Sequence, residues 1–126
     1  MYRENLPQQC PPGYAVVPNN FDVYRAIQAQ QPTLQDFDSQ ARLGTVNLEG
    51  RDDVFTCRAF SCSVFSNISG ARKLTKLPKF RGYKFIAHLR LDPTSGVVHN
   101  SSGYHYDWWI SAACNVLGCV IGVSNA

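Results

Sequence analysis

Acidic residues are absent between Val54 and Leu91, and no glutamate follows Glu49. The N-terminal and C-terminal parts of the chain therefore differ in net charge. Residues 1–53 hold seven acids against four arginines, whereas residues 54–126 hold eight lysines and arginines against two aspartates. A segment of one charge sign raises the local potential and attracts the opposite sign. We therefore expect an anionic partner, which is a nucleotide, a nucleic acid or an acidic protein.

Long apolar segments are also absent. The N-terminus lacks the apolar run of a secretory signal. The tail Trp108–Ala126 carries no charge, but serines and asparagines interrupt it, so it falls short of the roughly 20 apolar residues of a membrane span. The sequence thus predicts a cytoplasmic protein that does not enter a membrane, with a buried element at its C-terminal end.

The remaining composition is that of one globular domain. The chain has 126 residues, 44% of them hydrophobic, which matches a single core of about 100–150 residues. Prolines and a glycine punctuate residues 1–20, so this part is expected to be an irregular lead-in. Residues 21–126 are expected to form one α+β domain, an antiparallel-rich sheet with one or two short helices packed on it.

The chain has five cysteines, an odd number. Without a secretory signal, we expect them to be reduced and to behave as small buried hydrophobic residues. A Cys-x4-Cys spacing occurs twice, at Cys57/Cys62 and at Cys114/Cys119. Zinc-binding pairs are usually separated by about two to four residues, so zinc stays an alternative and no metal site is predicted.

Strands are predicted by composition and by period-2 alternation. In Tyr83–Leu91 every second residue is apolar, with Lys84, His88 and Arg90 on the other face. A turn at Asp92–Gly96 follows. The other expected strands are Phe21–Ile27, one or two strands in Val54–Phe65 after a turn at Gly50–Asp53, a hairpin of Val97–His99 and Tyr104–Trp109 around a four-residue loop, Asn100–Gly103, and a tail, Ile110–Val123, that is a strand pair or a short helix.

Two helices are expected from capping signals. Thr33 precedes Asp36 by three residues, as in a capping box, and Gly44 would end the helix that follows. The second helix has Ser69 as its expected cap and Pro78 as its stop. Apolar residues recur along both helices: Leu34, Phe37 and Ala41 in the first, and Ile68, Ala71, Leu74 and Leu77 in the second.

A basic segment runs from the second helix into the strand that follows. Phe80, Tyr83 and Phe85 are interleaved with its cations. Cations for phosphates and flat rings for bases are what surfaces that bind single-stranded nucleic acid combine. The alternative is a solvated helix and strand face. The residues assigned to this candidate anion-binding surface are Arg72, Lys73, Lys76, Lys79, Arg81 and Lys84.

The aromatic hairpin is the richest place for chemistry. In a strand, His105, Asp107 and Trp109 share one face, and the tyrosines share the other with Trp108. A histidine beside a carboxylate suits acid–base work, while aromatic rings suit the wall of a pocket for a planar ligand. An aromatic core hairpin with a structural histidine remains the alternative. A nucleophile within Ser61-Cys62-Ser63, served by a distant histidine, is a further possibility.

Short motifs in chain order resemble those of the ADP-ribosyltransferase-like toxins. They are Tyr24-Arg25-Ala26 in an early strand, Ser61-Cys62-Ser63 in a later strand, a helix with Ala71, and a strand ending near Gly96. The resemblance implies that Arg25 holds NAD, that Ser61 and Ser63 brace the site, and that a late carboxylate stabilises the transition state. The family's late glutamate is missing, and Asp107 is the carboxylate that can replace it.

These observations leave three classes of function open. The first is an enzyme that uses NAD, with His105, Asp107 and Arg25 as catalytic residues and a ligand site made by Tyr24, Ser61, Ser63, Tyr104, Tyr106 and Trp108. The second is an interaction protein that docks on an acidic protein, as an effector or inhibitor does. The third is a nucleic-acid-binding module that uses residues 72–84. The enzyme requires Arg25 and Asp107 to share one concave site.

Overall fold

The protein, seen in a computed structural model that describes residues 1–126, is built on one antiparallel sheet of six strands. The strand order is β4-β5-β2-β1-β3-β6. The strands are β1 (Phe21–Ile27), β2 (Cys62–Phe65), β3 (Phe85–Leu91), β4 (Gly96–Ser102), β5 (His105–Ile110) and β6 (Val120–Asn125), and the α-helices are α1 (Gln40–Leu43), α2 (Asp53–Ala59) and α3 (Ile68–Thr75). Three 3-10 helices complete the fold: η1 (Leu34–Phe37), η2 (Pro78–Phe80) and η3 (Leu117–Cys119). This is the α+β fold that the sequence predicts.

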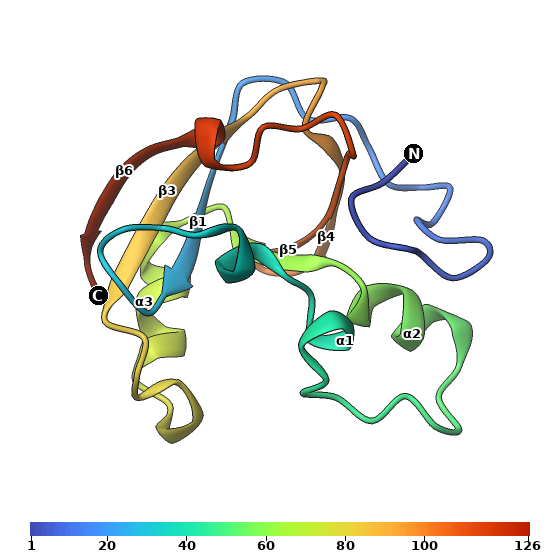
Figure 1. The fold of residues 1–126 in the computed structure, drawn as a ribbon, viewed down its shortest axis with the longest axis horizontal. Helices are drawn as coiled ribbons and strands as arrows, with labels where there is room; N and C mark the ends of the chain where they lie inside the picture. Colours follow the sequence, from blue (N-terminus) through green and yellow to red (C-terminus); the bar gives the residue numbers. More distant parts are fainter.

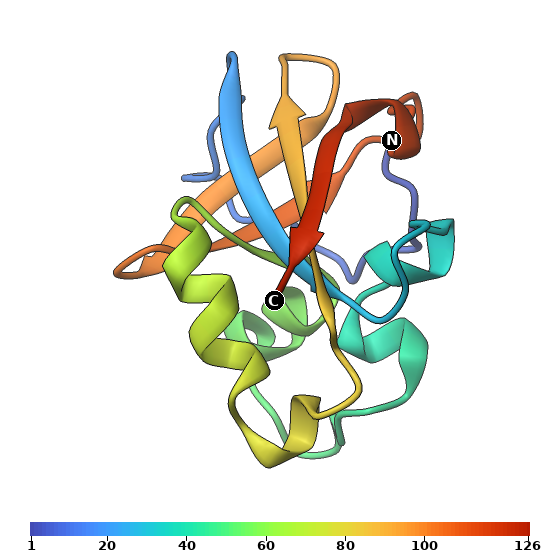
Figure 2. The same ribbon diagram turned by 90° about the vertical axis from the view of Figure 1, so that its left-hand side faces the viewer.

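The sheet consists of two halves that a single residue pair of the ladder joins. β1 runs beside β3 through seven residue pairs, and β2 beside β5 through four, but β1 and β2 share the single pair Tyr24↔Phe65. The halves β4-β5-β2 and β1-β3-β6 therefore part beyond that pair. In Figures 1 and 2 the three α-helices gather at one end of the sheet, the lower end in both views.

Side chains fill the two faces of the sheet differently. The main core holds Val23 and Ile27 from β1, Leu89 from β3 and Trp108 from β5, all fully buried. On the other face, Ile86 and Ala26 pack under Ala71 of α3. This second core holds α3 against β1. The prediction that alternate residues of β3 are buried is confirmed, although Ile86 is also buried because α3 covers it.

The segment that precedes β2 corrects one prediction. Asp53–Ala59 is the helix α2, not a strand, and only Cys62–Phe65 is extended. The side chain of Asp52 accepts a hydrogen bond from the Phe55 amide, and Asp53 and Arg58 lie at the helix ends that favour their charges. These terminal interactions outweigh the strand propensity of the valine, phenylalanine and threonine between them.

The two predicted helices differ from the structure in detail. The Thr33/Asp36 capping box is present, but it opens the short helix η1, and Ser39 caps a separate α1 that ends at Gly44. In α3 the cap is Asn67 rather than Ser69, because the Asn67 side chain accepts a hydrogen bond from the amide of Ser69.

The hairpin and the tail need smaller corrections. Only Gly103 and Tyr104 lie between β4 and β5, so the loop has two residues instead of four, and a bulge near Ser102 takes up the rest. The predicted buried tail is η3 followed by β6, an edge strand with no buried residue. The tail places Ile110 and Val116 in the core, and four of its residues pack against the core partly buried: Cys114, Cys119, Val120 and Val123.

The cysteines are not all free. Cys10 and Cys57 form a disulfide that joins the N-terminal lead-in to α2, whereas Cys62, Cys114 and Cys119 are thiols. The lead-in is irregular, as predicted, but it is also tied to the sheet by the bridges Tyr2↔Ser111 and Val16↔Val98. None of the helices has the length and apolar character that crossing a bilayer requires.

Candidate functional site

A cleft of about 450 Å³ opens where β1 and β2 part. Strands that separate leave backbone groups without ladder partners, and polar side chains or ligands can satisfy those groups. The volume is within the range of small-molecule sites, about 300–1,000 Å³. The lining residues include Arg25, Lys79, Ser61, Ser63, His105 and Tyr83.

Arg25 bridges the parting strands. Its Nε donates to the Asp36 carbonyl oxygen at 2.7 Å, and its Nη1 donates to the Ser63 carbonyl oxygen at 2.6 Å. Nη2 reaches the Asp38 carbonyl oxygen at 3.5 Å. The guanidinium group is thus fixed by backbone atoms of η1, β2 and the residue after η1. Since arginine has five N–H donors, the group retains donors for a ligand.

The charge of Arg25 has no carboxylate partner. Arg3 and Arg25 are the two arginines that are not exposed, and Arg3 pairs with Asp38 at 2.8 Å and lies 3.9 Å from Glu4. Arg25 forms no ion pair, because the nearby Asp38 carboxylate is directed to Arg3 and Arg42. A half-buried guanidinium group without an ion-pair partner, facing a cleft that Asp38 and Lys79 also line, is chemically suited to bind an anion.

His105 lies on β5 at the wall that this cleft shares with two neighbouring hollows. Its Nδ1 contacts the hydroxyl group of Ser101, and its ring meets Phe65 edge-on at 5.3 Å. Partial burial lowers the pKa of His105, more than the nearby Asp107 raises it. The imidazole is therefore neutral near pH 7, and it can donate or accept a hydrogen bond in the cleft.

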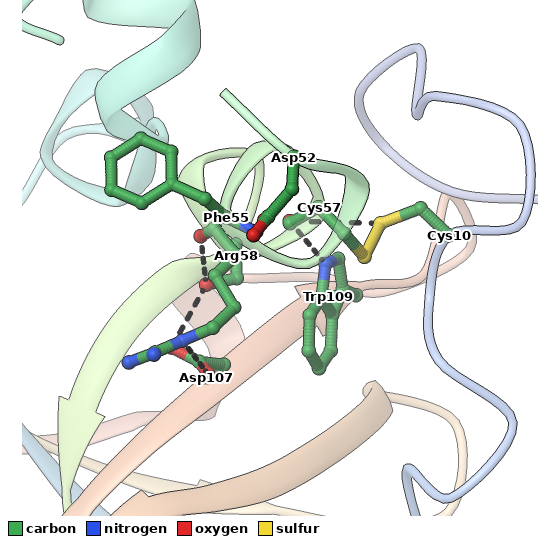
Figure 3. The surroundings of a disulfide bond; sticks show 8 residues. Cys10, Asp52, Phe55, Cys57, Arg58, Asp107 and Trp109 are labelled. Carbon is green, nitrogen blue, oxygen red and sulfur yellow. Dashed lines mark hydrogen bonds and ion pairs between the residues drawn. A yellow bond between two sulfur atoms is a disulfide. The ribbon is translucent and has the colours of Figure 1, made fainter. Parts of the chain in front are cut away.

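Asp107 is more deeply buried than His105. Its carboxylate accepts from Arg58 Nε at 3.1 Å and from the Ser61 hydroxyl group at 3.3 Å, and the side chain is only 3% exposed. Figure 3 shows this pair beside the disulfide, where the indole of Trp109 donates to the Cys57 carbonyl oxygen at 3.1 Å. Asp107 does not line the cleft that holds Arg25. It lines an adjoining hollow of about 270 Å³ that shares Ser61, Ser63 and His105 with the cleft, so Arg25 and Asp107 do not share one cavity as the enzyme hypothesis requires.

Of the nine residues predicted as catalytic or ligand-binding, four line the cleft together: Arg25, Ser61, Ser63 and His105. The predicted aromatic walls do not. Tyr24 stacks on His88 at 4.5 Å, Tyr106 packs edge-on against Phe21, and Trp108 is fully buried in the core. Tyr104 lies in the hairpin turn and lines a neighbouring hollow with Lys73. Strand alternation sends Tyr106 and Trp108 to the face opposite His105.

Other aromatic residues supply the walls instead. Phe65, Phe80 and Tyr83 line the cleft, together with Gln40 and Thr45 from the α1 region. Phe80 and Tyr83 meet edge-on at 5.2 Å. The interleaving of aromatic and basic residues in the sequence indicates that Phe80 and Tyr83 face a ligand. The ligand that this pattern predicts is nucleic acid. Nothing in the local pattern indicated Gln40 or Thr45, because long-range packing brings them to the cleft.

The six cations of the candidate anion-binding surface are all exposed, and none forms an ion pair: Arg72, Lys73, Lys76, Lys79, Arg81 and Lys84. They lie on α3, on η2 and in the connection to β3. Lys79 also lines the cleft, so that a second positive charge joins Arg25 there.

Comparison with protein families, with characterised proteins and with solved structures gives no match to this chain. No three of its histidine, cysteine, aspartate and glutamate side chains are grouped as metal ligands are. What the cleft does must therefore be argued from its own geometry.

Proposed function

We propose that the chain is an NAD-binding domain of the ADP-ribosyltransferase type, with its ligand in the cleft between β1 and β2. The observation that supports this most is the unneutralised guanidinium group of Arg25, fixed between two separating strands at the wall of the cleft. A diphosphate is the anion that such a group suits, since a planar guanidinium binds phosphate oxygens in pairs.

The other lining residues suit the rest of a dinucleotide. Lys79 adds a positive charge, and Phe65, Phe80 and Tyr83 offer flat apolar surfaces to heterocyclic rings. The hydroxyl group of Ser63 and the neutral ring of His105 supply short-range hydrogen bonds that orient ribose and amide groups. The proton of the Ser61 hydroxyl group is already directed to the Arg58 carbonyl oxygen at 2.7 Å and to Asp107, so Ser61 can only accept.

Binding is better supported than group transfer. The transition state of a glycosyl transfer carries positive charge on the sugar, and a carboxylate stabilises it. Asp107 is the carboxylate available on β5, but Arg58 and Ser61 already occupy its oxygens. Transfer by this chain therefore requires Asp107 to exchange Arg58 for the substrate.

Calorimetric titration with NAD tests the proposal. Arg25→Lys keeps the positive charge but loses the planar set of donors, so we expect NAD affinity to fall by about tenfold or more. Arg90→Lys is the matched control. Arg90 is an exposed β3 arginine paired with Asp22 at 2.7 Å. It lies three residue pairs from Arg25 along the β1–β3 ladder and outside the lining of the cleft, so its replacement should leave the affinity unchanged.

Release of nicotinamide, measured on the same samples, separates binding from transfer. Loss of release in Asp107→Asn with retained NAD binding assigns the transfer step to Asp107. If wild-type protein binds neither NAD nor ADP-ribose while its circular dichroism shows a folded chain, the proposal is wrong.

A second candidate function is the binding of an acidic macromolecule through the six exposed, unpaired cations. Their lack of ion-pair partners favours it. Binding of this kind weakens steeply with salt. Retention of the protein on single-stranded DNA that falls with salt, and that Lys73→Gln combined with Lys76→Gln weakens, supports it. Retention that changes neither with salt nor in the double variant contradicts this second function.

A further inference from the structure

Two thiols lie in contact at the far end of the chain, away from the cleft. The sulfur atoms of Cys114 and Cys119 are 3.8 Å apart, and both side chains are half-buried against the core. The hydroxyl group of Ser95 lies 3.9 Å from the Cys119 sulfur. The two sulfur atoms are neighbours, and water can reach both residues.

The turn between the cysteines holds them in this arrangement. The Asn115 side chain accepts from the Gly118 amide at 3.2 Å, and the Cys119 amide donates to the carbonyl oxygens of Asn115 and Val116. Val116 is buried in the core and anchors the turn. The closeness of the two sulfur atoms thus follows from a hydrogen-bonded, anchored turn.

The two thiols differ in acidity. Hydrogen bonds that Cys119 accepts from Cys114 and Ser95 lower its pKa to about 7. The pKa of Cys114 is raised, because its proton is held in the bond to Cys119 and because it is partly buried. The thiolate is the form that attacks a disulfide, and the fastest attacking thiol has a pKa near the ambient pH. The Ser95 hydroxyl group beside the Cys119 sulfur favours the same sulfur as the thiolate, so we assign Cys119 as the attacking thiol.

We propose that Cys114 and Cys119 are an oxidisable pair that closes to a second disulfide under the conditions in which the Cys10–Cys57 disulfide persists. The odd number of cysteines is then accounted for, since Cys62 is left alone. Cys62 is 2% exposed, and burial raises the pKa of its thiol, so it does not compete for an oxidant.

The oxidant is a small-molecule disulfide, for which oxidised glutathione serves as the probe. The Cys119 thiolate attacks one glutathione sulfur, forming a mixed disulfide and releasing one glutathione thiolate. Cys114 then gives its proton to solvent and attacks the Cys119 sulfur, which releases the second glutathione thiolate. The protein loses two electrons and two protons, and the glutathione disulfide takes up the two electrons.

Peptide mapping tests the proposal on the full chain. Trypsin places Cys114 and Cys119 together in residues 91–126, and it separates Cys10, Cys57 and Cys62 into three other peptides. After exposure to oxidised glutathione and alkylation without reduction, we expect residues 91–126 unalkylated and lighter by two hydrogen atoms, with the Cys62 peptide alkylated. The same peptide carrying two alkyl groups, beside an intact Cys10–Cys57 disulfide, overturns the proposal.

The single-serine variants identify the nucleophile. Both variants leave a serine hydroxyl group beside the remaining thiol, but the Ser95 hydroxyl group lies 3.9 Å from the Cys119 sulfur. The thiol of Cys119 in Cys114→Ser should therefore take up glutathione severalfold faster at pH 7 than the thiol of Cys114 does in Cys119→Ser. Both variants must keep the wild-type circular dichroism spectrum. Equal rates, or a faster Cys114, contradict the assignment of Cys119.

Discussion

At the scale of single residues, the binding proposed for the cleft depends on which charged side chains lack an ion-pair partner. Arg25 is fixed by carbonyl oxygens and keeps its full charge, whereas Asp107 gives up its accepting capacity to Arg58 and Ser61. His105 lines both the cleft that contains Arg25 and the hollow that contains Asp107. Arg25 and Lys79 are free for a ligand, whereas Asp107 is engaged, so the proposed function rests on binding more than on transfer.

The lowered pKa of His105 predicts how stability varies with pH. Its pKa in the folded chain lies below the value of 6.5 that it has when unfolded. Below about pH 6.5 the unfolded chain therefore takes up a proton that the folded chain does not, and acidification favours unfolding. Above that pH, His105 adds no pH dependence.

Urea unfolding between pH 7.5 and about pH 5 measures this effect. We expect the fall in the free energy of unfolding below pH 6.5 to be smaller in His105→Gln than in the wild-type chain. His88→Gln serves as the control, because His88 lies on β3 beside Asp22, outside the cleft. An unchanged fall in His105→Gln contradicts the proposed desolvation of His105.

At the scale of elements, the turn between β3 and β4 shows where backbone geometry decides the sequence. Gly96 has a φ of +126°, and a Cβ atom built there overlaps the Trp109 carbonyl oxygen and lies 2.8 Å from the Ser111 amide nitrogen. Gly103, in the β4–β5 turn, has a φ of +51° and open space around it. Position 96 requires glycine for two reasons. Its φ is unfavourable for residues with a side chain, and the close approach of β5 leaves no room for a Cβ atom.

Replacing these glycines by alanine separates the two requirements. Gly96→Ala should lower the free energy of unfolding by about 3 kcal/mol or more, because strain and overlap add, whereas Gly103→Ala should cost about 1 kcal/mol for the left-handed backbone alone. Chemical denaturation of both variants measures the difference. Equal losses would mean that the backbone of β5 yields to the new side chain.

The elements also show how far a sequence can predict this molecule. Local patterns were enough for β1 and β3, where alternation and composition agree with the burial. They failed at Asp53–Ala59, where capping by Asp52 outweighed strand propensity. Arg25, Ser61, Ser63 and His105 could be named in advance, but their cleft exists because β1 and β2 share one residue pair. No local pattern encodes that separation.

At the scale of the whole molecule, the Cys10–Cys57 disulfide ties the irregular lead-in to α2 across 47 residues. Beside it, Trp109 donates to the Cys57 carbonyl oxygen, so the lead-in, α2 and β5 meet at one place (Figure 3). A cross-link over a loop of this length stabilises a fold mainly by restricting the unfolded chain.

Removal of this disulfide should be costly. The double variant Cys10→Ala/Cys57→Ala should lower the free energy of unfolding by about 3–4 kcal/mol, measured by urea denaturation. The pair Cys114→Ser/Cys119→Ser is the control. It should lose less, because both residues are thiols in the structure and even the disulfide proposed for them closes a loop of only five residue steps. A loss for Cys10/Cys57 no larger than that of the control contradicts a role of the long loop.

The proposed function depends on Arg25 as the anion-binding group of a dinucleotide cleft. Nuclear magnetic resonance of the arginine Nε–H groups and backbone amides of the wild-type chain during titration with NAD tests this role directly. We expect saturable shifts at Arg25 Nε–H and at the amides of Ser63 and His105, with Arg90 Nε–H unmoved. Saturable shifts confined to other parts of the molecule, with Arg25 unchanged, would contradict it.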